Sequence, residues 1–459
     1  METVKLSNKK HMAWLITFLV PIVILLVPNN ETFTDPVQIF FAITLGVILW
    51  FAFELTNNFI PALLLPVAYT LSGITSASTA FSSWGSNTPW MVLGALLIVV
   101  IVERIGLLTR AAYFVLSKLA VSYKSFLYGL MVIGILFNLI FSGITYILLI
   151  PVVYGACCAL GFKGTKEGAG IMLAGMCAAN MPSMIVYNPG MLGIGAAVIE
   201  ETMGISIGWM SCLLQNIVLF PLCFLMIFII TKLYKPEKAF YGKEFFESKK
   251  KEAGKMSIEE KKGLALLIVL LIGLVTSDIH GIDIGWITVL VTIAFYFPGI
   301  NLGTEDDIKK INFPIVVFMV SCMSIGQVSA ELGIGELLAG IITPIMENVP
   351  VPVFILITWL LAVIVNLMMT PLAAIAAFTI PIAQIALNYG ISPIPVMYTF
   401  VQGLDQVFLP YEYLNYLFAF SFGLVTTKQF LQFFTLKMAV NIVYIMVIVV
   451  PYWMLIGLI

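Results

Sequence analysis

The chain has 459 residues, of which 61% are hydrophobic and only 10% are charged, and its formal net charge is −1. A soluble domain has about 25% charged residues, so this composition excludes a water-soluble globular protein and a disordered chain. Without an excess of positive charge, the chain is not expected to bind nucleic acid. The composition is typical of a polytopic membrane protein whose apolar surface faces lipid.

Apolar runs predict an all-α fold with about eleven transmembrane helices, since one span needs ~20 apolar residues. In chain order the runs lie near 13–28, 37–53, 59–74, 89–103, 168–200, 208–231, 263–278, 285–300, 314–330, 392–425 and 432–458. Two more apolar stretches, 125–162 and 352–388, are too long for one helix and are interrupted by short polar or Gly/Pro elements. We predict that both are re-entrant hairpins, which enter and leave the membrane on the same side.

The basic residues fall on one side of this predicted topology. All 23 Lys and Arg lie in or near the N-terminus, 104–124, 163–166, 232–262, 309–310 and 428–437, with Lys437 just inside the last span. The positive-inside rule makes this side cytoplasmic. The sequence therefore predicts a multi-pass protein of the cell (plasma) membrane with its N-terminus inside and its C-terminus outside.

Short segments recur about 225–228 residues apart and indicate an internal repeat. Phe137-Asn138-Leu139 resembles Val365-Asn366-Leu367, and Asn216-Ile217-Val218 resembles Asn441-Ile442-Val443. Because the first copy starts outside and the second starts inside, the predicted repeats are inverted, which is common in secondary transporters. The predicted parts are an N-terminal segment with the first helix (1–36), repeat 1 (37–231, hairpin 125–162, broken helix 168–200), a basic linker in the form of a solvated cytoplasmic loop (232–262), and repeat 2 (263–459, hairpin 352–388, broken helix 392–425).

Predicted breaks in these helices carry the candidate binding residues. The hairpins turn near 138–145 and 366–371, and the broken helices are interrupted near 180–190 and 409–415. Half-helix N-termini favour anions, and unwound carbonyls and side-chain oxygens bind Na⁺. We predict that the solute is bound by Asn138, Ser142, Gly143, Thr145, Asn188, Asn366, Thr370 and Asn415. The predicted ion-coupling residues are Ser142, Asn188, Pro189, Thr370, Asp405, Glu412 and Asn415. The alternative is that Gly and Pro only kink these helices.

Two acidic residues, Asp405 and Glu412, lie within the second predicted broken helix, with no Lys or Arg close to them in sequence. Seven residues apart, they are predicted to lie near one helix face. Carboxylates inside the membrane are costly and generally functional. They could couple transport to protons or bind Na⁺ or a cationic substrate, or they could be hydrated at the outer interface.

Several motifs resemble the divalent anion:sodium symporter family of the ion-transporter superfamily. They are Gly46-Val47-Ile48-Leu49-Trp50 followed by Glu54 and Pro61, Phe318-Met319-Val320 through Gly333, and the order of hairpin and broken helix. The resemblance spans nearly the whole chain. It implies an elevator-type homodimer that carries dicarboxylates, citrate or sulfate with Na⁺.

The sequence departs from this family at the hairpin tips. The family's Ser-Asn-Thr is replaced by Phe141-Ser142-Gly143 and Met368-Met369-Thr370. Of the Thr-Pro-Pro-Asn-like elements, only Asn188 with Pro189, and Asn415, remain. The resemblance therefore implies a divergent member, in which Glu412 is our candidate to replace part of the missing motif.

The resulting hypothesis is an ion-coupled secondary active transporter, a symporter of a small organic or inorganic anion such as a carboxylate, with elevator-type alternating access. The chain has no GxxxxGK[ST], HExxH or GxSxG with a histidine partner, so an enzyme is not expected. No cofactor or metal is expected beyond Na⁺ or H⁺ as coupling ion, and the expected partners are the anion, lipid and a second copy of the chain. Alternatives are a proton-coupled carrier or exchanger of another solute, a channel, or a membrane-embedded enzyme.

Overall fold

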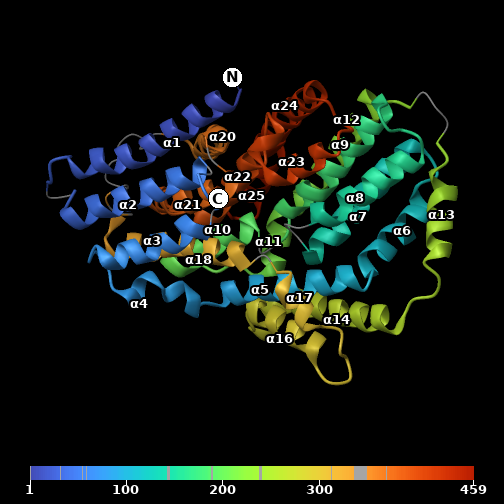
Figure 1. Ribbon diagram of the computed structural model, residues 1–459, viewed down its shortest axis with the longest axis horizontal. Helices are drawn as coiled ribbons and strands as arrows, with labels where there is room; N and C mark the ends of the chain where they lie inside the picture. Colours follow the sequence, from blue (N-terminus) through green and yellow to red (C-terminus); the bar gives the residue numbers. More distant parts are fainter. Residues whose placement is uncertain are drawn as a thin grey trace.

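The computed structural model of the protein describes all residues except 1, 31–32, 54, 58, 142–144, 188–189, 237–239, 312, 335–336, 338–348 and 369. This described part is helical and contains no β-strand, in agreement with the predicted all-α class (Figure 1). The helices before the basic linker are α1 (Glu2–Leu25), α2 (Asp35–Ala52), α3 (Phe59–Leu71), α4 (Ala77–Ala80), η1 (Ser82–Gly85), α5 (Asn87–Arg104), α6 (Leu107–Leu119), α7 (Tyr123–Phe141), α8 (Thr145–Ala159), α9 (Lys166–Asn180), η2 (Met181–Met184), α10 (Met191–Met203), α11 (Trp209–Asn216), η3 (Ile217–Leu219) and α12 (Phe220–Leu233).

The linker and the second half form a similar series. They contain α13 (Gly242–Glu252), α14 (Ile258–Val275), α15 (Ser277–His280), α16 (Ile284–Tyr296), α17 (Glu305–Lys309), α18 (Phe313–Glu331), α20 (Val351–Met368), α21 (Pro371–Asn388), α22 (Pro393–Leu404), η4 (Pro410–Glu412), α23 (Leu414–Ser421), α24 (Thr427–Tyr444), η5 (Ile445–Val449) and α25 (Val450–Leu455). Helices α5, α7, α8 and α9 begin at residues 87, 123, 145 and 166, and α18, α20, α21 and α22 begin at 313, 351, 371 and 393. The same order therefore recurs 226 to 228 residues later.

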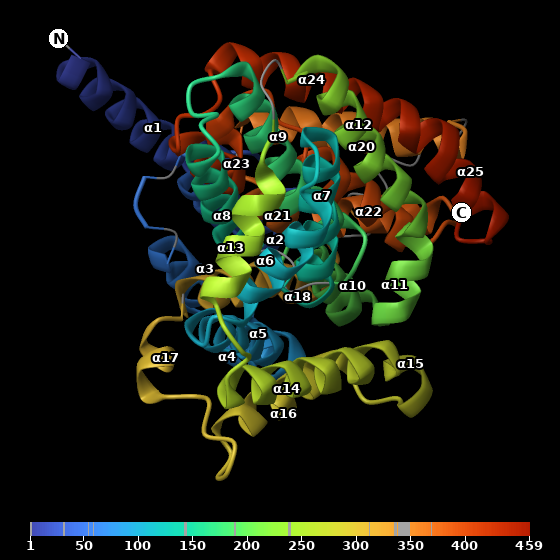
Figure 2. The same cartoon turned by 90° about the vertical axis from the view of Figure 1, so that its right-hand side faces the viewer.

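The packing of these helices follows the same pairing. Helices α7 and α8 both pack on α9, and their counterparts α20 and α21 both pack on α22. Between the halves, α3 packs on α18 while α16 packs on α5, where α16 is the counterpart of α3 and α18 the counterpart of α5. Such an exchange of partners is what a two-fold relation between two halves produces. Figure 2 shows α14, α16 and α17 together along one side of the molecule, next to α5.

Four helical segments are long and apolar enough to cross a membrane: Asn87–Arg104, Trp209–Leu233, Phe313–Glu331 and Thr427–Leu455. Eight further apolar helical stretches among the described residues are 10–17 residues long. Among the described residues, the predicted number of eleven crossings is therefore not established. The sides on which the two hairpins open, and the orientation of the termini, also stay predictions.

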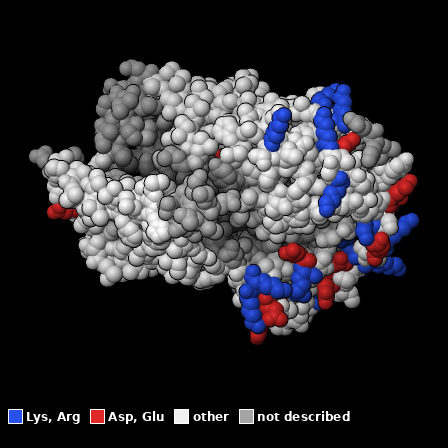
Figure 3. All heavy atoms as spheres, turned by 45° about the horizontal axis from the view of Figure 1, so that its top comes forward, with Lys and Arg blue, Asp and Glu red and all other residues white. Residues whose placement is uncertain are grey.

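The surface is consistent with an apolar surrounding over most of the molecule. Large apolar side chains are exposed along α1, α3, α14 and α24, and Phe18, Leu71, Ile272 and Val443 are all more than half exposed. On the face drawn in Figure 3, the charged side chains gather toward one end, and much of the remainder carries none. This distribution is typical of a chain with one large lipid-facing surface.

The segment 232–262 differs from the solvated loop that the sequence predicted. It contains α13, which packs along α6, and the Phe246 ring is fully buried against Phe126. The reason is that Phe245-Phe246 gives this Lys/Glu-rich segment an apolar side, which a charge count overlooks. Lys243, Lys250 and Lys251 stay exposed beside it.

Candidate functional site

The first helix break follows α9. The α-helix ends at Asn180, a 3₁₀ turn covers Met181–Met184, and α10 starts at Met191. Pro182 has no N–H and its ring would clash with the carbonyl of residue 178 in a continued α-helix. The Ser183 hydroxyl donates to the Asn180 carbonyl at 2.6 Å, and the Asn180 amide donates to the Met176 carbonyl at 2.9 Å, so local side chains satisfy the open end of α9.

The second helix break follows α22, which ends at Leu404, and regular α-helix resumes at Leu414. Pro410 stands in the interruption, where it again prevents a continuous α-helix. The Glu412 carboxylate accepts hydrogen bonds from the backbone N–H groups of Phe408 and Leu409, both at 2.9 Å. Glu412 therefore holds the unwound backbone in shape, a function that its spacing in the sequence did not indicate.

A buried asparagine in each predicted hairpin binds the neighbouring break. The Asn138 amide, near the end of α7, donates to the Ala179 carbonyl at 3.1 Å. The Asn366 amide, near the end of α20, donates to the Gln406 carbonyl at 3.2 Å. The two hydrogen bonds occupy matching positions in the two halves, so each hairpin is joined to its own broken helix in the same way.

Close backbone approach makes these contacts possible. A Cβ atom added to Gly134 of α7 would lie 2.0 Å from the Ala178 carbonyl oxygen of α9. In the second half the glycine is on the other partner: a Cβ on Gly403 of α22 would lie 2.5 Å from Cβ of Ala362 in α20. A side chain on either glycine would therefore collide with the facing helix.

The two breaks meet at a hydrogen bond between the halves. The Asn415 amide, in the first turn of α23, donates to Asn180 Oδ1 at 2.7 Å, and both side chains are buried. Asn415 was predicted as a site residue, whereas Asn180 was recognised only as part of a break. The first turn of α23 is thereby joined to the C-terminal end of α9.

Asp405 forms a buried ion pair that its sequence neighbourhood did not reveal. Its Oδ2 lies 2.7 Å from Lys437 Nζ of α24, and its Oδ1 accepts the Tyr416 hydroxyl at 2.8 Å. The exposed fractions of the Lys437 and Asp405 side chains are 1% and 3%. Lys437 was predicted to lie just inside the last span, and what the sequence did not predict is its partner, a buried carboxylate 32 residues away.

The prediction that Asp405 and Glu412 share a helix face is also wrong. Asp405 is the C-cap of α22, and Glu412 lies in η4 beyond the unwound segment, so helical periodicity does not connect them. They have separate partners: Lys437 for Asp405, and backbone N–H groups for Glu412.

The remaining predicted residues are placed as follows. Thr145 is fully buried as the first residue of α8, and Thr370 is half-buried directly before α21. Ser142, Gly143, Asn188 and Pro189, as well as Glu54, lie outside the described residues. The structure adds Asn180, Gln406, Tyr416 and Lys437, of which only Asn180 carried a sequence signal, an amide directly before a proline-containing break.

Unpartnered polar atoms lie beside the second break. Asn366 Oδ1 and both amide atoms of Gln402 are buried without a hydrogen-bond partner among the described residues. Gln402 is one helical turn before Gln406, whose amide donates to the Gln402 carbonyl at 2.8 Å. Buried polar groups normally have a partner, so these atoms are available to a bound solute or ion.

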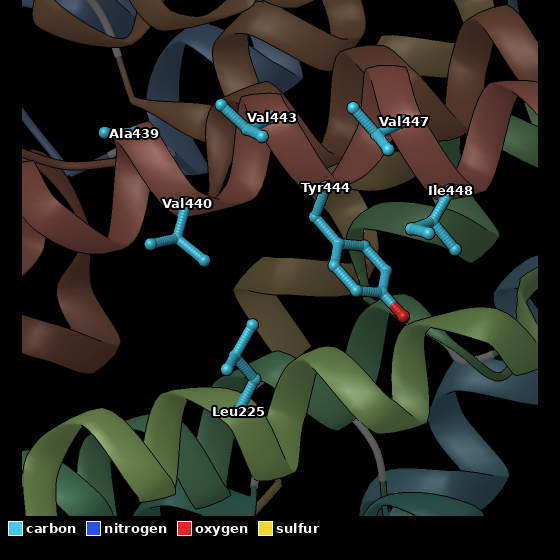
Figure 4. A pocket seen from close by; sticks show the side chains of 7 residues that line it. All are labelled: Leu225, Ala439, Val440, Val443, Tyr444, Val447 and Ile448. Atoms are coloured by element: carbon cyan, nitrogen blue, oxygen red, sulfur yellow. The ribbon is translucent and has the colours of Figure 1, made fainter.

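An apolar groove of about 350 Å³ between α12 and α24 is separate from this region. Figure 4 shows Leu225 on α12 opposite Val440, Val443 and Tyr444 on α24. The Tyr444 hydroxyl already donates to the Val218 carbonyl at 2.7 Å, and Val443 is 61% exposed. The groove therefore faces the apolar surroundings and offers no binding group to an anion.

Paired helix breaks in an apolar, internally repeated helical chain define the class of secondary membrane transporters. The chain belongs to the sodium:sulfate symporter family, since the model described as "Sodium:sulfate symporter transmembrane region" matches residues 8–459. It is accordingly a secondary active transporter of anions in a membrane.

A solved structure supports the fold. The crystal structure of the YdaH transporter of Alcanivorax borkumensis, described as revealing an unusual topology, is similar with a TM-score of 0.59 and 16% sequence identity. The similarity covers 90% of this chain and 98% of that one. No curated protein matches the sequence.

Proposed function

We propose that the protein is a Na⁺-coupled symporter of a small anion, such as a carboxylate or an inorganic oxyanion, in the cell membrane. The observation that carries this proposal is the Asn415–Asn180 hydrogen bond, because it brings the two helix breaks, one from each half, to one buried place. In secondary transporters, substrate and ion sites lie where discontinuous helices of two repeats meet.

The anion is proposed to bind at the N-terminal ends of α10 and α23. The first N–H groups of a helix have no partner within it, and the helix dipole places positive potential there. Asn415 in the first turn of α23 adds an amide, and Asn188, just before α10, would add another by its place in the sequence. Neither helix has a Lys or Arg, so an anion would be held by dipoles and amides.

Na⁺ is proposed to travel with the anion, bound by oxygens near the hairpins. Asn366 Oδ1 and Gln402 Oε1 are buried oxygens without a partner among the described residues, and both belong to residues beside the second break. Carbonyl and amide oxygens are suited to such a hard cation. Thr370 and Thr145 stand at the starts of the two returning hairpin helices, where their hydroxyls could add to the ion sites.

Alternating access is proposed to occur by an elevator movement of the hairpins and broken helices together. The Asn138–Ala179 and Asn366–Gln406 hydrogen bonds support this, since they join each hairpin to its broken helix. Helices α2, α3, α5, α14 and α16 would form the static part and, in a homodimer, the contact between copies. Glu412 would act by holding the shape of the second break.

The test is uptake into proteoliposomes with a panel of labelled anions: sulfate, succinate, citrate and monocarboxylates. We expect uptake of at least one anion to require an inward Na⁺ gradient and to show trans-stimulated exchange. Uptake driven equally well by a proton gradient in choline medium would favour the proton-coupled alternative. Leakage without exchange would favour a channel, and either result would overturn the proposal.

A variant links this activity to the site. Asn415→Ala removes the bridge between the breaks and leaves Asn180 Oδ1 buried without its donor, so we expect uptake to fall at least tenfold. Asn388→Ala is the matched control, because Asn388 is exposed at the end of α21. Equal loss of uptake in both variants would contradict the assignment of the site.

A further inference from the structure

The buried Lys437 ammonium has the surroundings of a bound cation. Its Nζ donates to Asp405 Oδ2 at 2.7 Å, to the Asp405 carbonyl at 3.0 Å and to Gln406 Oε1 at 3.2 Å. These are a carboxylate, a backbone carbonyl and an amide oxygen. Such oxygens, at the C-terminal end of a half-helix, are the ligands that bind Na⁺ in transporters with broken helices.

The position of this ammonium is the second break itself. Asp405 is the C-cap of α22, so its carbonyl belongs to the open, negative end of that half-helix. The adjacent Gln406 carbonyl accepts the hydrogen bond from Asn366 of the hairpin. Lys437 thus supplies one positive charge at the point where hairpin and broken helix meet.

The surroundings keep this charge in place. The rings of Tyr416 and Phe434 lie with their centroids 5.8 and 5.7 Å from Lys437 Nζ, and the Tyr416 hydroxyl holds the other carboxylate oxygen of Asp405. With 1% of its side chain exposed, Lys437 is shielded from water. An ammonium with oxygens on one side and aromatic faces on another is stabilised by both.

The first half of the chain shows that the fold does not require this pair. Asn138 binds the Ala179 carbonyl where Asn366 binds the Gln406 carbonyl, so Ala178 corresponds to Asp405. Asn216 corresponds to Asn441, so Cys212, four residues earlier, corresponds to Lys437. Both charges are therefore absent from the equivalent place in the first half, where Ala178 and Cys212 are buried apolar residues.

We propose that Lys437 is a built-in cation that takes the place of one coupling Na⁺ at the second helix break, with Asp405 as its counter-ion. The inference rests on the proposed Na⁺ symport and refines its stoichiometry. The second break carries its own positive charge through the transport cycle, and one Na⁺ fewer accompanies the anion than if a further Na⁺ occupied the position of the ammonium.

The test replaces Lys437 by an apolar side chain of similar length. In Lys437→Met, the Asp405 carboxylate and the two oxygens beside it are left without a cation, and Na⁺ can enter their site. We expect the rise in melting temperature on exchanging choline for Na⁺ at constant ionic strength to be larger than in the unmodified protein, because a ligand that binds the folded state stabilises it. We also expect the Hill coefficient of uptake for Na⁺ to rise by about one.

Two variants serve as controls. Asp405→Asn combined with Lys437→Met removes the carboxylate as well, and its Na⁺-dependent stabilisation should return to that of the unmodified protein. Lys428→Met removes an exposed lysine from the first turn of the same helix and should change neither readout. If Lys437→Met responds to Na⁺ no more than the unmodified protein does, the proposal is overturned.

Should Lys437→Met be unstable, the yield of monodisperse protein purified in Na⁺ is compared with the yield in choline. Rescue by Na⁺ supports the proposal, and equal yields overturn it. Failure of the proposed symport would be seen separately, because uptake by the unmodified protein would then not depend on Na⁺. The inference about Lys437 is decided by the difference in Na⁺-dependent stability between Lys437→Met and the unmodified protein.

Discussion

The close approach of α7 to α9 at Gly134 gives the sharpest test of the site geometry. In Gly134→Ala the new Cβ would start 2.0 Å from the Ala178 carbonyl oxygen, whereas ordinary contact begins at 3.4 Å. The obstacle is backbone, so the two helices must separate by more than about 1 Å. The Asn138 amide, bound to the Gly134 carbonyl at 2.8 Å and the Ala179 carbonyl at 3.1 Å, would be disturbed as well.

The expected cost follows from these two effects. Overpacking of this kind costs about 1–3 kcal/mol, and a weakened buried hydrogen bond adds about 1 kcal/mol. We therefore expect the free energy of unfolding to fall by about 2–4 kcal/mol and the melting temperature by several degrees. A displacement of about 1 Å at a binding site can cost 100-fold in rate, so uptake should fall about 10- to 100-fold.

Gly155→Ala in α8 is the matched control. A Cβ added to Gly155 has no atom within 4 Å, and the residue is exposed in the interior of a helix. Alanine there should be neutral or should stabilise the helix by about 0.5–1 kcal/mol. Melting curves and anion uptake of both variants decide the matter. Equal melting temperatures and rates for the two variants would refute the reasoning.

Three further predictions concern other contacts. Asn138→Ala and Asn366→Ala should each lower stability by about 1–3 kcal/mol and uptake at least tenfold, because the amide of each joins a hairpin to its break. Glu412→Gln leaves one acceptor oxygen where two are used, so we expect a loss of about 1–2 kcal/mol and a lower maximal rate, with an unchanged Hill coefficient for Na⁺. Burial opposes ionisation of Glu260, but hydrogen bonds from Arg110 and from its helix cap outweigh it and place the carboxyl pKa below its usual range. The ion pair should therefore stabilise the protein above a pH of about 4.3 and be lost as pH falls through the lowered pKa, so Glu260→Gln should melt below the unmodified protein at pH 7, with the difference shrinking toward acid.

Each of these predictions has its own opposing result. For the two asparagines, the opposing result is uptake at the unmodified level in Asn138→Ala or in Asn366→Ala, because matching contacts in the two halves should both be needed. For Glu412, the opposing result is an altered Hill coefficient for Na⁺, which would indicate that the carboxylate binds the ion. The control is Glu259→Gln, on the exposed first turn of α14. For Glu260 it would be a melting difference that stays constant between pH 7 and pH 4.

The internal repeat and the helix breaks could be predicted from local features of the sequence. The repeat is visible from Asn138 and Asn366, and the breaks from Pro182 and Pro410, because a proline acts on the helix that contains it. Asn415 was also identified locally, by its place in a break. Its hydrogen-bond partner Asn180 could not be assigned, since the two residues are 235 positions apart.

The site residues that sequence reasoning missed depend on tertiary contacts. In the sequence, Lys437 was only counted with the basic residues near the predicted cytoplasmic side. Its pairing with Asp405 depends on the packing of α24 against the end of α22. Arg104 has the acidic Glu103 next to it in the sequence, but its guanidinium binds Asp307 of the other half at 2.8 Å. Charge counting uses proximity in the chain and cannot foresee such pairs.

The crossed packing of the halves, with α3 on α18 and α16 on α5, has a consequence for biosynthesis. When the first half leaves the ribosome, the surfaces that will receive α16 and α18 have nothing to cover them. At translation rates of ~5–20 residues per second, the ~100 residues up to the end of α18 take roughly 5–20 s to appear. For that time the nascent chain exposes the bare sides of α3 and α5 to the bilayer or to the insertion machinery, so truncated chains ending before α18 should be rapidly degraded.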